Sequence, residues 1–534
     1  MDMYLLMRGS SFKMNMKTVS IGNLLLLLIL IFFQSYAWYY LLLTVAQLVF
    51  VPLVLHILLE TKGEKHPFLV FLFTIASVAV FTLQVTGDTM LDGFLVCLYI
   101  LYTAVIAFIG IKRFLQRGFV HMEECLIELG MIHLLVGGAW YLAFQLNLNL
   151  GFSPIITWLT AIHFHYAGFL LLVFIGFLGR IQKVKSYSFI AFTACVAPWV
   201  VAIGISFSRF LEVVSVLVYM VAIYGGIYLA CKTPYERKLQ KALIPISFLA
   251  LGVSIVFSLL YAVGNWTGLF HVSLSFMLLF HGGTNGLLFA AIGVLGWYLG
   301  APSSKAKEWN FPISNIRGWR KKRELEKLSE PVQGLVEDMD IYRLQALDRE
   351  VRRFYENTNR YQLLARVYWH PWFLPFAGLY KIISRFVQQI NLPLTPREIE
   401  MTGQVVKVDD AEDGRESVRA WIRKVDNQTV FVALYSFHTT KATTYMNIAL
   451  PLPFSTMIGI LKLEEEKGKR LSLSSKDNGE AGIYLAIGKS RMKLPLQEHF
   501  TVSTKEKGNL EAIHRMTIFS IPFLTIQYTI KQKD

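Results

Sequence analysis

The first 302 residues contain repeated apolar stretches, each long enough to cross a lipid bilayer. A transmembrane helix needs about 20 predominantly apolar residues, and no stretch of that length follows Pro302. Residues 1–302 hold only 16 of the 52 Lys and Arg residues and 10 of the 37 Asp and Glu residues. The chain therefore changes solvent near Pro302, and the sequence predicts an α-helical transmembrane bundle at 1–302 followed by a water-facing α+β part.

We expect about ten transmembrane helices. The apolar pattern places them at 19–35, 38–58, 67–86, 91–111, 123–146, 155–178, 187–207, 211–231, 242–263 and 271–299. The first of them, with Lys13 and Lys17 before it and Ser35-Tyr36-Ala37 at its end, also resembles a secretory signal with a cleavage site. The apolar pattern resumes at once, which favours an uncleaved anchor.

The basic residues between the spans orient the bundle. Cytoplasmic loops carry an excess of Lys and Arg, and here 15 of the 16 basic residues fall on one set of alternate connections, with Arg209 alone on the other. We therefore expect a multi-pass protein whose two termini are both cytoplasmic. The residues of the inner set are Arg8, Lys13, Lys17, Lys62, Lys65, Lys112, Arg113, Arg117, Arg180, Lys183, Lys185, Lys232, Arg237, Lys238 and Lys241.

Three histidines lie deep within different predicted spans. His133, His163 and His281 each fall about 8–10 residues inside a span, which at about 1.5 Å per residue places them near the bilayer centre. Ionisable groups at this depth usually face the bundle interior. They can bind a metal ion or haem, relay protons or hydrogen-bond a polar ligand, or each can satisfy a neighbouring carbonyl or hydroxyl and fix helix register.

The strings around two of these histidines refine the hypothesis. In T-A-I-H-F-H-Y-A-G-F, His163 and His165 point about 200° apart on a helix, so they cannot converge on one ligand. In H-G-G-T-N-G, Asn285 lies one turn from His281 on the same face. The three glycines there permit either a close helix approach or local unwinding that frees backbone carbonyls. The predicted ligand-binding residues are His133, His163, His281 and Asn285, and the first three are also the candidate metal ligands.

Acidic residues mark the cytoplasmic start of the fifth span. His121, Glu124 and Glu128 have helical spacing, which can supply metal ligands from one helix face. Carboxylates at a membrane boundary are more commonly solvated or ion-paired. We expect an ion pair with Lys112 or Arg113.

The connection to the second part, 303–322, is strongly basic and contains two tryptophans. Basic residues next to a span are attracted to anionic headgroups, and Trp prefers the headgroup region. We expect this linker to lie on lipid, which explains the net charge of +15 without a nucleic-acid partner, since no nucleic-acid-binding motif is present. The expected lipid-interface residues are Lys305, Lys307, Trp309, Arg317, Trp319, Arg320, Lys321, Lys322 and Arg323.

The water-facing part changes periodicity within itself. Residues 323–395 have a helical pattern, and the aromatic run 366–386 is expected to be either an interfacial amphipathic segment or a helix packed across a sheet. Within 396–534 apolar residues alternate with polar ones, as at 524–530, and turn signals separate short runs. This pattern predicts an antiparallel β barrel or sandwich, which can enclose an apolar ligand or be a solid module.

No catalytic constellation accompanies these features: the sequence has no G-x-S-x-G elbow, P-loop or supported carboxylate pair. The leading hypothesis is a non-enzymatic protein that binds or moves a small solute or amphiphile through the His/Asn site, with the β domain as a ligand-binding or regulatory module. One alternative is a membrane metalloprotein or haem-containing redox enzyme, and another is a membrane-anchored sensor or scaffold. No motif identifies a cofactor.

Several strings resemble one known family. T-A-I-H-F-H-Y-A-G-F and H-G-G-T-N-G in the bundle, followed by F-Y-E-N-T-N-R-Y and I-P-F-L-T-I-Q-Y, are similar to the YndJ-like family of bacterial membrane proteins. The similarity covers most of the chain. It implies a location in the bacterial cell (inner) membrane, and it carries over no catalytic residue.

Overall fold

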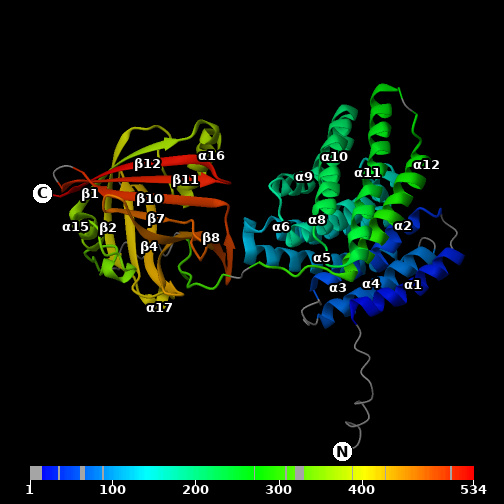
Figure 1. Cartoon of the computed structure of the whole chain (residues 1–534), viewed down its shortest axis with the longest axis horizontal. Coiled ribbons are helices and arrows are strands. Elements are labelled where there is room, and N and C mark those ends of the chain that lie inside the picture. Colours follow the sequence, from blue (N-terminus) through cyan, green and yellow to red (C-terminus); the bar gives the residue numbers. More distant parts are fainter. Residues whose placement is uncertain are drawn as a thin grey trace, which may run out of the picture. The chain divides into compact units, whose positions relative to one another are not determined.

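The computed structural model describes residues 15–33, 37–59, 66–86, 89–269, 271–306, 309–318, 330–387, 389–426, 428–505 and 508–533. The chain divides into two compact units. The membrane bundle comprises Met1–Phe114 and His121–Ala306, and the β-barrel domain comprises Leu115–Val120 and Lys307–Asp534. In Figure 1 the helices of the bundle run from blue to green and the strands of the barrel from yellow to red.

The predicted helical bundle is confirmed. Within the described residues, nine helices are long and apolar enough to cross a membrane, and α1 is a shorter apolar helix. The bounds follow the sequence-based spans closely, because the length of each apolar run sets its helix. The helices are α1 (Met16–Phe33), α2 with η2 and α3 (Tyr40–Val45, Ala46–Phe50, Val51–Leu59), α4 (Pro67–Val85), α5 with η3 (Asp92–Arg117, Gly118–Val120), α6 (Met122–Gln145), α7 with η4 and α8 (Pro154–His165, Tyr166–Leu171, Leu172–Ile181), α9 (Tyr187–Phe207), α10 (Arg209–Lys232), α11 (Lys238–Thr267), and α12 with η5, η6 and α13 (Leu274–Phe276, Met277–Gly282, Thr284–Ala291, Ile292–Leu299).

Three of the spanning helices contain π-helical segments, and two of these segments, η5 and η6, contain predicted site residues. His165 directly precedes η4, whereas His281 lies in η5 and Asn285 in η6. π-Helical turns inside α-helices frequently occur at functional sites. The H-G-G-T-N-G string therefore stays helical, and its glycines serve a close approach: a Cβ on Gly286 would lie 2.8 Å from the Leu42 side chain.

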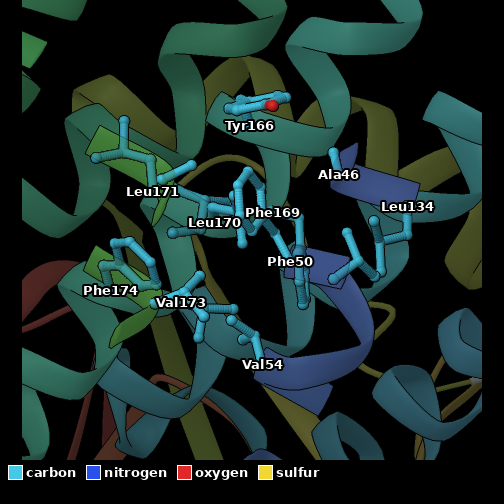
Figure 2. Close-up of a cluster of buried hydrophobic side chains, with 14 of the residues drawn as sticks. Ala46, Phe50, Val54, Leu134, Tyr166, Phe169, Leu170, Leu171, Val173 and Phe174 are labelled. Atoms are coloured by element: carbon cyan, nitrogen blue, oxygen red, sulfur yellow. The ribbon is translucent and has the colours of Figure 1, made fainter. Parts of the chain in front are cut away.

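The span formed by α7, η4 and α8 is the most completely buried of the nine. Figure 2 shows its side chains Phe169 to Phe174 gathered with Phe50 and Val54 from η2 and α3 and with Leu134 from α6. The Phe50 ring meets Tyr166 edge-on with centroids 6.4 Å apart. A helix that is apolar on all sides packs at the centre of a bundle, which explains its place here.

The second unit is an antiparallel β barrel, as predicted. The twelve strands of its described residues form one sheet in the order β5-β4-β3-β2-β1-β12-β11-β10-β7-β6-β8-β9, and an additional pairing of β5 with β6 closes the ring. Closure leaves no free edge in that ring and creates an interior. The strands are β1 (Tyr361–Trp369), β2 (Glu398–Lys407), β3 (Arg419–Val425), β4 (Gln428–Thr440), β5 (Thr443–Leu452), β6 (Ser455–Glu466), β7 (Arg470–Ser474), β8 (Gly482–Ile487), β9 (Ser490–Lys493), β10 (Leu496–Thr504), β11 (Leu510–Ile518) and β12 (Ile521–Gln532).

The barrel has two hydrophobic cores, one on each face of β3. Trp421 belongs to the interior core, together with Leu524 and Ile526 of β12. Ile422 faces the opposite way and belongs to the outer core, which Phe311 and Ile316 of the linker complete. The period-two alternation of a strand thus serves both cores. The linker covers one outer face of the barrel wall.

The segment 323–395 differs from its helical expectation. It contains the short helices η7 (Met339–Tyr342), α15 (Arg349–Glu356), η8 (Thr358–Arg360), η9 (Pro371–Phe373) and α16 (Leu374–Val387), but also strand β1, which pairs with β2 and β12. A further short helix, α17 (Asp410–Asp413), follows β2. The strand alternates buried Leu363, Ala365 and Val367 with more accessible neighbours. Tertiary pairing therefore decides the conformation of β1.

Candidate functional site

Of the predicted site residues, His281 and Asn285 contact each other directly. Asn285 Nδ2 lies 3.0 Å from His281 Nε2, and Asn285 Oδ1 accepts a 2.7 Å hydrogen bond from Ser254 Oγ. His281 Nδ1 is 3.1 Å from Ser258 Oγ and 3.3 Å from the Ser254 carbonyl. Because a carbonyl only accepts, Nδ1 donates and Nε2 accepts from Asn285. The group is a self-consistent polar cluster of α11, η5 and η6 around a neutral imidazole.

The other two predicted histidines have separate partners. His163 Nδ1 donates to the Leu159 carbonyl at 2.6 Å, and His163 is exposed. His133 Nδ1 donates to the Gly168 carbonyl at 3.1 Å. His133 Nε2 is buried without a hydrogen-bond partner, and the ring stands edge-on to Phe164 and Trp199. The structure thus gives His163 and His133 separate backbone partners and places the His133 ring beside Phe164 and Trp199.

The metal hypothesis needs three of these side chains around one ion. Among the described residues, no group of three or more His, Cys, Asp or Glu side chains is arranged to hold a metal ion. Each of the three imidazoles instead donates to a nearby backbone carbonyl, which orients its ring toward its own neighbours.

The sequence did not single out a close contact between His165 and Tyr99 in the bundle. His165 Nε2 lies 2.6 Å from the Tyr99 hydroxyl, and His165 Nδ1 donates to the Ala161 carbonyl at 2.8 Å. Tyr99 is therefore the donor. The buried Gln47 side chain neighbours the Tyr99 hydroxyl, but neither of its two polar atoms has a hydrogen-bond partner. Tyr99 and His165 are 66 residues apart, so only the tertiary fold joins them.

The acidic residues at the start of α6 form ion pairs. As predicted, Arg113 pairs with Glu124 at 3.5 Å and with Glu128 at 3.8 Å. The tighter partner is Arg180 of α8, whose Nε and Nη2 bind the two Glu124 oxygens at 2.7 and 2.8 Å. Arg180 Nη1 also donates to the Pro302 carbonyl at 3.1 Å. This buried network joins α5, α6, α8 and the chain after α13.

The predicted lipid-interface strip is only partly described. Lys307, Trp319, Arg320, Lys321, Lys322 and Arg323 lie outside the described residues, and Lys305 is exposed. Trp309 instead packs against the barrel, with its ring 5.4 Å from that of Tyr484. Arg317 donates to Ser314, Ile316 and Thr456 within the same domain. The structure therefore corrects the expectation for Trp309 and Arg317, whose side chains bind protein because the linker contributes to the outer core.

Helix α16 lies in the aromatic run 366–386, for which the sequence left two interpretations. Only Ala377 and Ser384 of this helix are buried, so it is not packed tightly across the sheet. Its apolar side chains at i, i+3, i+7 and i+10 share one exposed face. The side chains at this spacing are Phe376, Leu379, Ile383 and Phe386, and Leu374 and Ile382 are exposed as well.

The barrel interior contains a cavity of about 140 Å³. Its wall is mostly apolar, with side chains such as Met446, Leu461, Leu473 and Ile526. Ligand sites are typically apolar hollows with a few polar groups that fix orientation. The polar residues that line this cavity are Tyr355, Arg423, Tyr435, Glu498, His514 and Tyr528.

Two of these polar residues form a pair. Glu498 Oε2 lies 2.9 Å from His514 Nε2, joining β10 and β11. Burial raises the pKa of Tyr435 to about 12, although Arg423 opposes this rise. Burial likewise raises the pKa of Tyr528. Both tyrosines therefore remain neutral hydrogen-bonding groups at physiological pH.

Comparison with known proteins identifies relatives of this chain. Residues 41–289 match the family model described as YndJ-like protein. The chain is 34% identical over 471 residues to a Bacillus subtilis (strain 168) protein named "Uncharacterized membrane protein YndJ", covering 85% of this chain and 86% of that protein. No solved structure matches the chain.

Proposed function

Because this chain belongs to the YndJ-like family of membrane proteins, we propose that it binds and transports a small amphipathic solute, with the β-barrel domain as its ligand-binding module. The observation that carries the proposal is the cavity of about 140 Å³ inside the barrel. An apolar wall with a small number of polar groups suits a molecule that has one apolar and one polar end.

The membrane bundle supplies the second part of the proposal. We place a polar step of the solute route at His163, His281 and Asn285, supported by the direct contact between His281 and Asn285. His133 offers a further unpaired nitrogen. Polar groups within a membrane commonly mark such routes.

Ligand binding by the full-length protein in lipid nanodiscs tests the barrel module. Saturation-transfer NMR with benzamide as a neutral amphipathic probe should show binding to the wild type. Leu473→Trp fills the cavity and should remove the signal, whereas Phe454→Trp, at a fully accessible turn, should retain it. Equal signals from both variants contradict the proposal, provided that thermal unfolding shows both to be folded.

A solute-accumulation comparison separates transport from sensing. A strain that carries His281→Ala should show the same change in intracellular solute level as a strain that lacks the protein, because the Asn285 contact is removed. If His281→Ala is silent while Leu473→Trp abolishes the phenotype, the bundle only anchors a sensing barrel. The cavity in the soluble domain is the observation that favours this second candidate function.

We propose that the protein lies in the bacterial cell membrane with both termini cytoplasmic. The one-sided distribution of Lys and Arg supports this orientation. A C-terminal green fluorescent protein fusion should fluoresce, and a C-terminal alkaline phosphatase fusion should be inactive. The reverse result overturns the orientation.

The exposed face of α16 supports a lipid contact in addition to the spans. The β-barrel domain is tethered to the membrane, since only 11 residues separate Leu299 at the end of α13 from Phe311 in the outer core. Arg385 on the same helix is exposed and suits anionic headgroups. A spin label at Leu379→Cys, in a background lacking the four native cysteines, should be accessible to oxygen and shielded from a nickel chelate in proteoliposomes. A label at Arg366→Cys on β1 is the control, and equal nickel accessibility at both sites contradicts the proposal.

A further inference from the structure

Arg423 is a buried cation on the inner face of the barrel. Arg423 is 9% exposed and lines the cavity. It lies on β3, which pairs with β2 and β4. The guanidinium carbon lies 4.5 Å from the ring centroid of Trp421 and 4.3 Å from that of Phe431. These aromatic faces fix the side chain by cation–π contact, and the Tyr528 hydroxyl interacts with the guanidinium.

The Arg423 guanidinium has no acid to pair with in the part of the chain that the structure describes. Arg423 Nε is buried without a hydrogen-bond partner, and no ion pair involves Arg423 in the described residues. Glu498 lines the same cavity, but its carboxylate contacts His514 at 2.9 Å. Buried charges are normally paired, because an uncompensated charge in an apolar interior is costly. Within the described residues this cation therefore has no carboxylate partner.

We propose that the barrel cavity binds a small monocarboxylate, with the carboxylate on Arg423 and the apolar part among the aliphatic wall residues. The inference rests on the proposed function, since it names the chemical class of the ligand for that cavity. Arg is suited to this partner because its planar fork donates two parallel hydrogen bonds to a carboxylate. Tyr435 and Tyr528, which line the cavity and interact with Arg423, supply further hydroxyl groups near the head.

The cavity volume limits the apolar part of the ligand. An engineered cavity of about 150 Å³ lined by Leu, Ile and Phe accommodates benzene. The cavity here is of similar size, about 140 Å³. A ring or a short chain of comparable bulk fits, whereas the tail of a long-chain fatty acid does not. Benzoate is thus a suitable probe, and benzamide is its neutral counterpart of nearly the same shape.

Calorimetric titration of full-length protein in nanodiscs tests this inference. The wild type should bind benzoate about 10- to 100-fold more tightly than benzamide, as a charge-assisted pair with Arg423 implies. Arg423→Met should lose this preference by the same factor while its benzamide affinity stays within about threefold. Arg423→Lys keeps the charge without the fork and should fall between the two. Dodecanoate should bind the wild type no better than benzoate.

The outcomes separate the two proposals. If benzamide and benzoate both fail to bind the wild type, the proposed function fails and the inference fails with it. If benzamide binds but benzoate shows no preference, or Arg423→Met leaves the preference intact, only the carboxylate assignment is overturned. Tighter binding of dodecanoate that depends on Arg423 overturns the small ligand and assigns a lipid tail. Thermal unfolding of each variant establishes that the loss does not come from misfolding.

Discussion

Arg180 of the membrane bundle and Arg423 of the β-barrel domain are both buried, but their surroundings differ. In the bundle, Arg180 binds both oxygens of Glu124, and Arg113 adds a second cation to the same carboxylate. In the barrel, Arg423 lies among aromatic rings with an unpartnered Nε and without an ion pair in the described chain. Paired charges fix helices in place, whereas an unpaired charge beside a cavity can be paired by a ligand. The difference indicates which of the two buried cations is structural.

The largest effect is expected from breaking the pair in the bundle. Glu124→Gln leaves Arg180 buried without its carboxylate, so the free energy of unfolding should fall by about 3–5 kcal/mol. Detergent-titration unfolding in bicelles measures this loss.

The matched control is Glu398→Gln, which breaks the exposed pair with Arg366 at 3.1 Å in the barrel. An exposed pair contributes about 0–1 kcal/mol. A loss below about 1 kcal/mol for Glu124→Gln would show that the bundle does not depend on charge pairing, and the comparison would fail.

Lys493 is a partly buried cation and lies between the two cases. Its Nζ donates to the Ala481 carbonyl at 2.6 Å and lies 4.6 Å from the centroid of Trp309. Burial lowers the pKa of Lys493 to about 8. Because the pKa is lower in the folded than in the unfolded state, the unfolded state binds more protons above pH 8. Stability should therefore rise with pH, by about 1–2 kcal/mol between pH 7.5 and 9.5.

Chemical unfolding of the β-barrel domain within the full-length protein, followed at several pH values, measures this rise. Lys493→Met removes the titrating group, so the variant should not show this rise. The difference in the free energy of unfolding between variant and wild type should therefore shrink as the pH increases. A difference that is constant with pH would show that Lys493 carries its charge at no cost in the folded state.

The spans and the barrel class were predictable because their signals are local. The predicted span 187–207 coincides with α9, since a long apolar run needs no distant partner to become a helix. Period-two alternation also identified β12, whose Leu524 and Ile530 are buried as expected. Strand β1 was missed although Leu363, Ala365 and Val367 alternate, because the adjacent aromatic run continues into the helix α16 and dominated the interpretation.

The candidate sites were less predictable because their contacts are long-range. Arg423 follows Trp421 at a spacing of two, so the two side chains lie on the same face of β3. In the sequence alone, a charged residue in an alternating strand suggests a solvent-facing side rather than a barrel interior. Whether Arg423 has a partner depends on the side chains that β10 and β11 contribute to the same cavity. Likewise, His281 and Asn285 were joined by helical spacing, whereas Ser254 and Ser258 came from another helix.

Removing the unpaired cation should stabilise the empty barrel. Arg423→Met replaces a buried charge by an apolar chain of similar length, so the free energy of unfolding without ligand should increase by about 1–2 kcal/mol, after loss of the cation–π contacts. Arg415→Met is the matched control, because Arg415 pairs with Asp413 at 2.6 Å in the same domain and its removal should be strongly destabilising. If Arg423→Met destabilises as much as Arg415→Met, Arg423 is a structural residue and the contrast with the bundle disappears.

The smallest effect concerns the neutral polar contact of the bundle. Tyr99→Phe keeps the ring, whose centroid lies 5.7 Å from that of Tyr141, but removes the hydroxyl that donates to His165. Hydrogen bonds between membrane helices contribute about 0.6–1.7 kcal/mol, so unfolding in bicelles should show a loss in that range. Tyr228→Phe, at an exposed position of α10, should show none. A loss above about 3 kcal/mol would mean that the Tyr99 hydroxyl supports more than His165. The neighbouring Gln47 amide would then belong to a functional polar centre, and the bundle would hold an open site of its own as the barrel does.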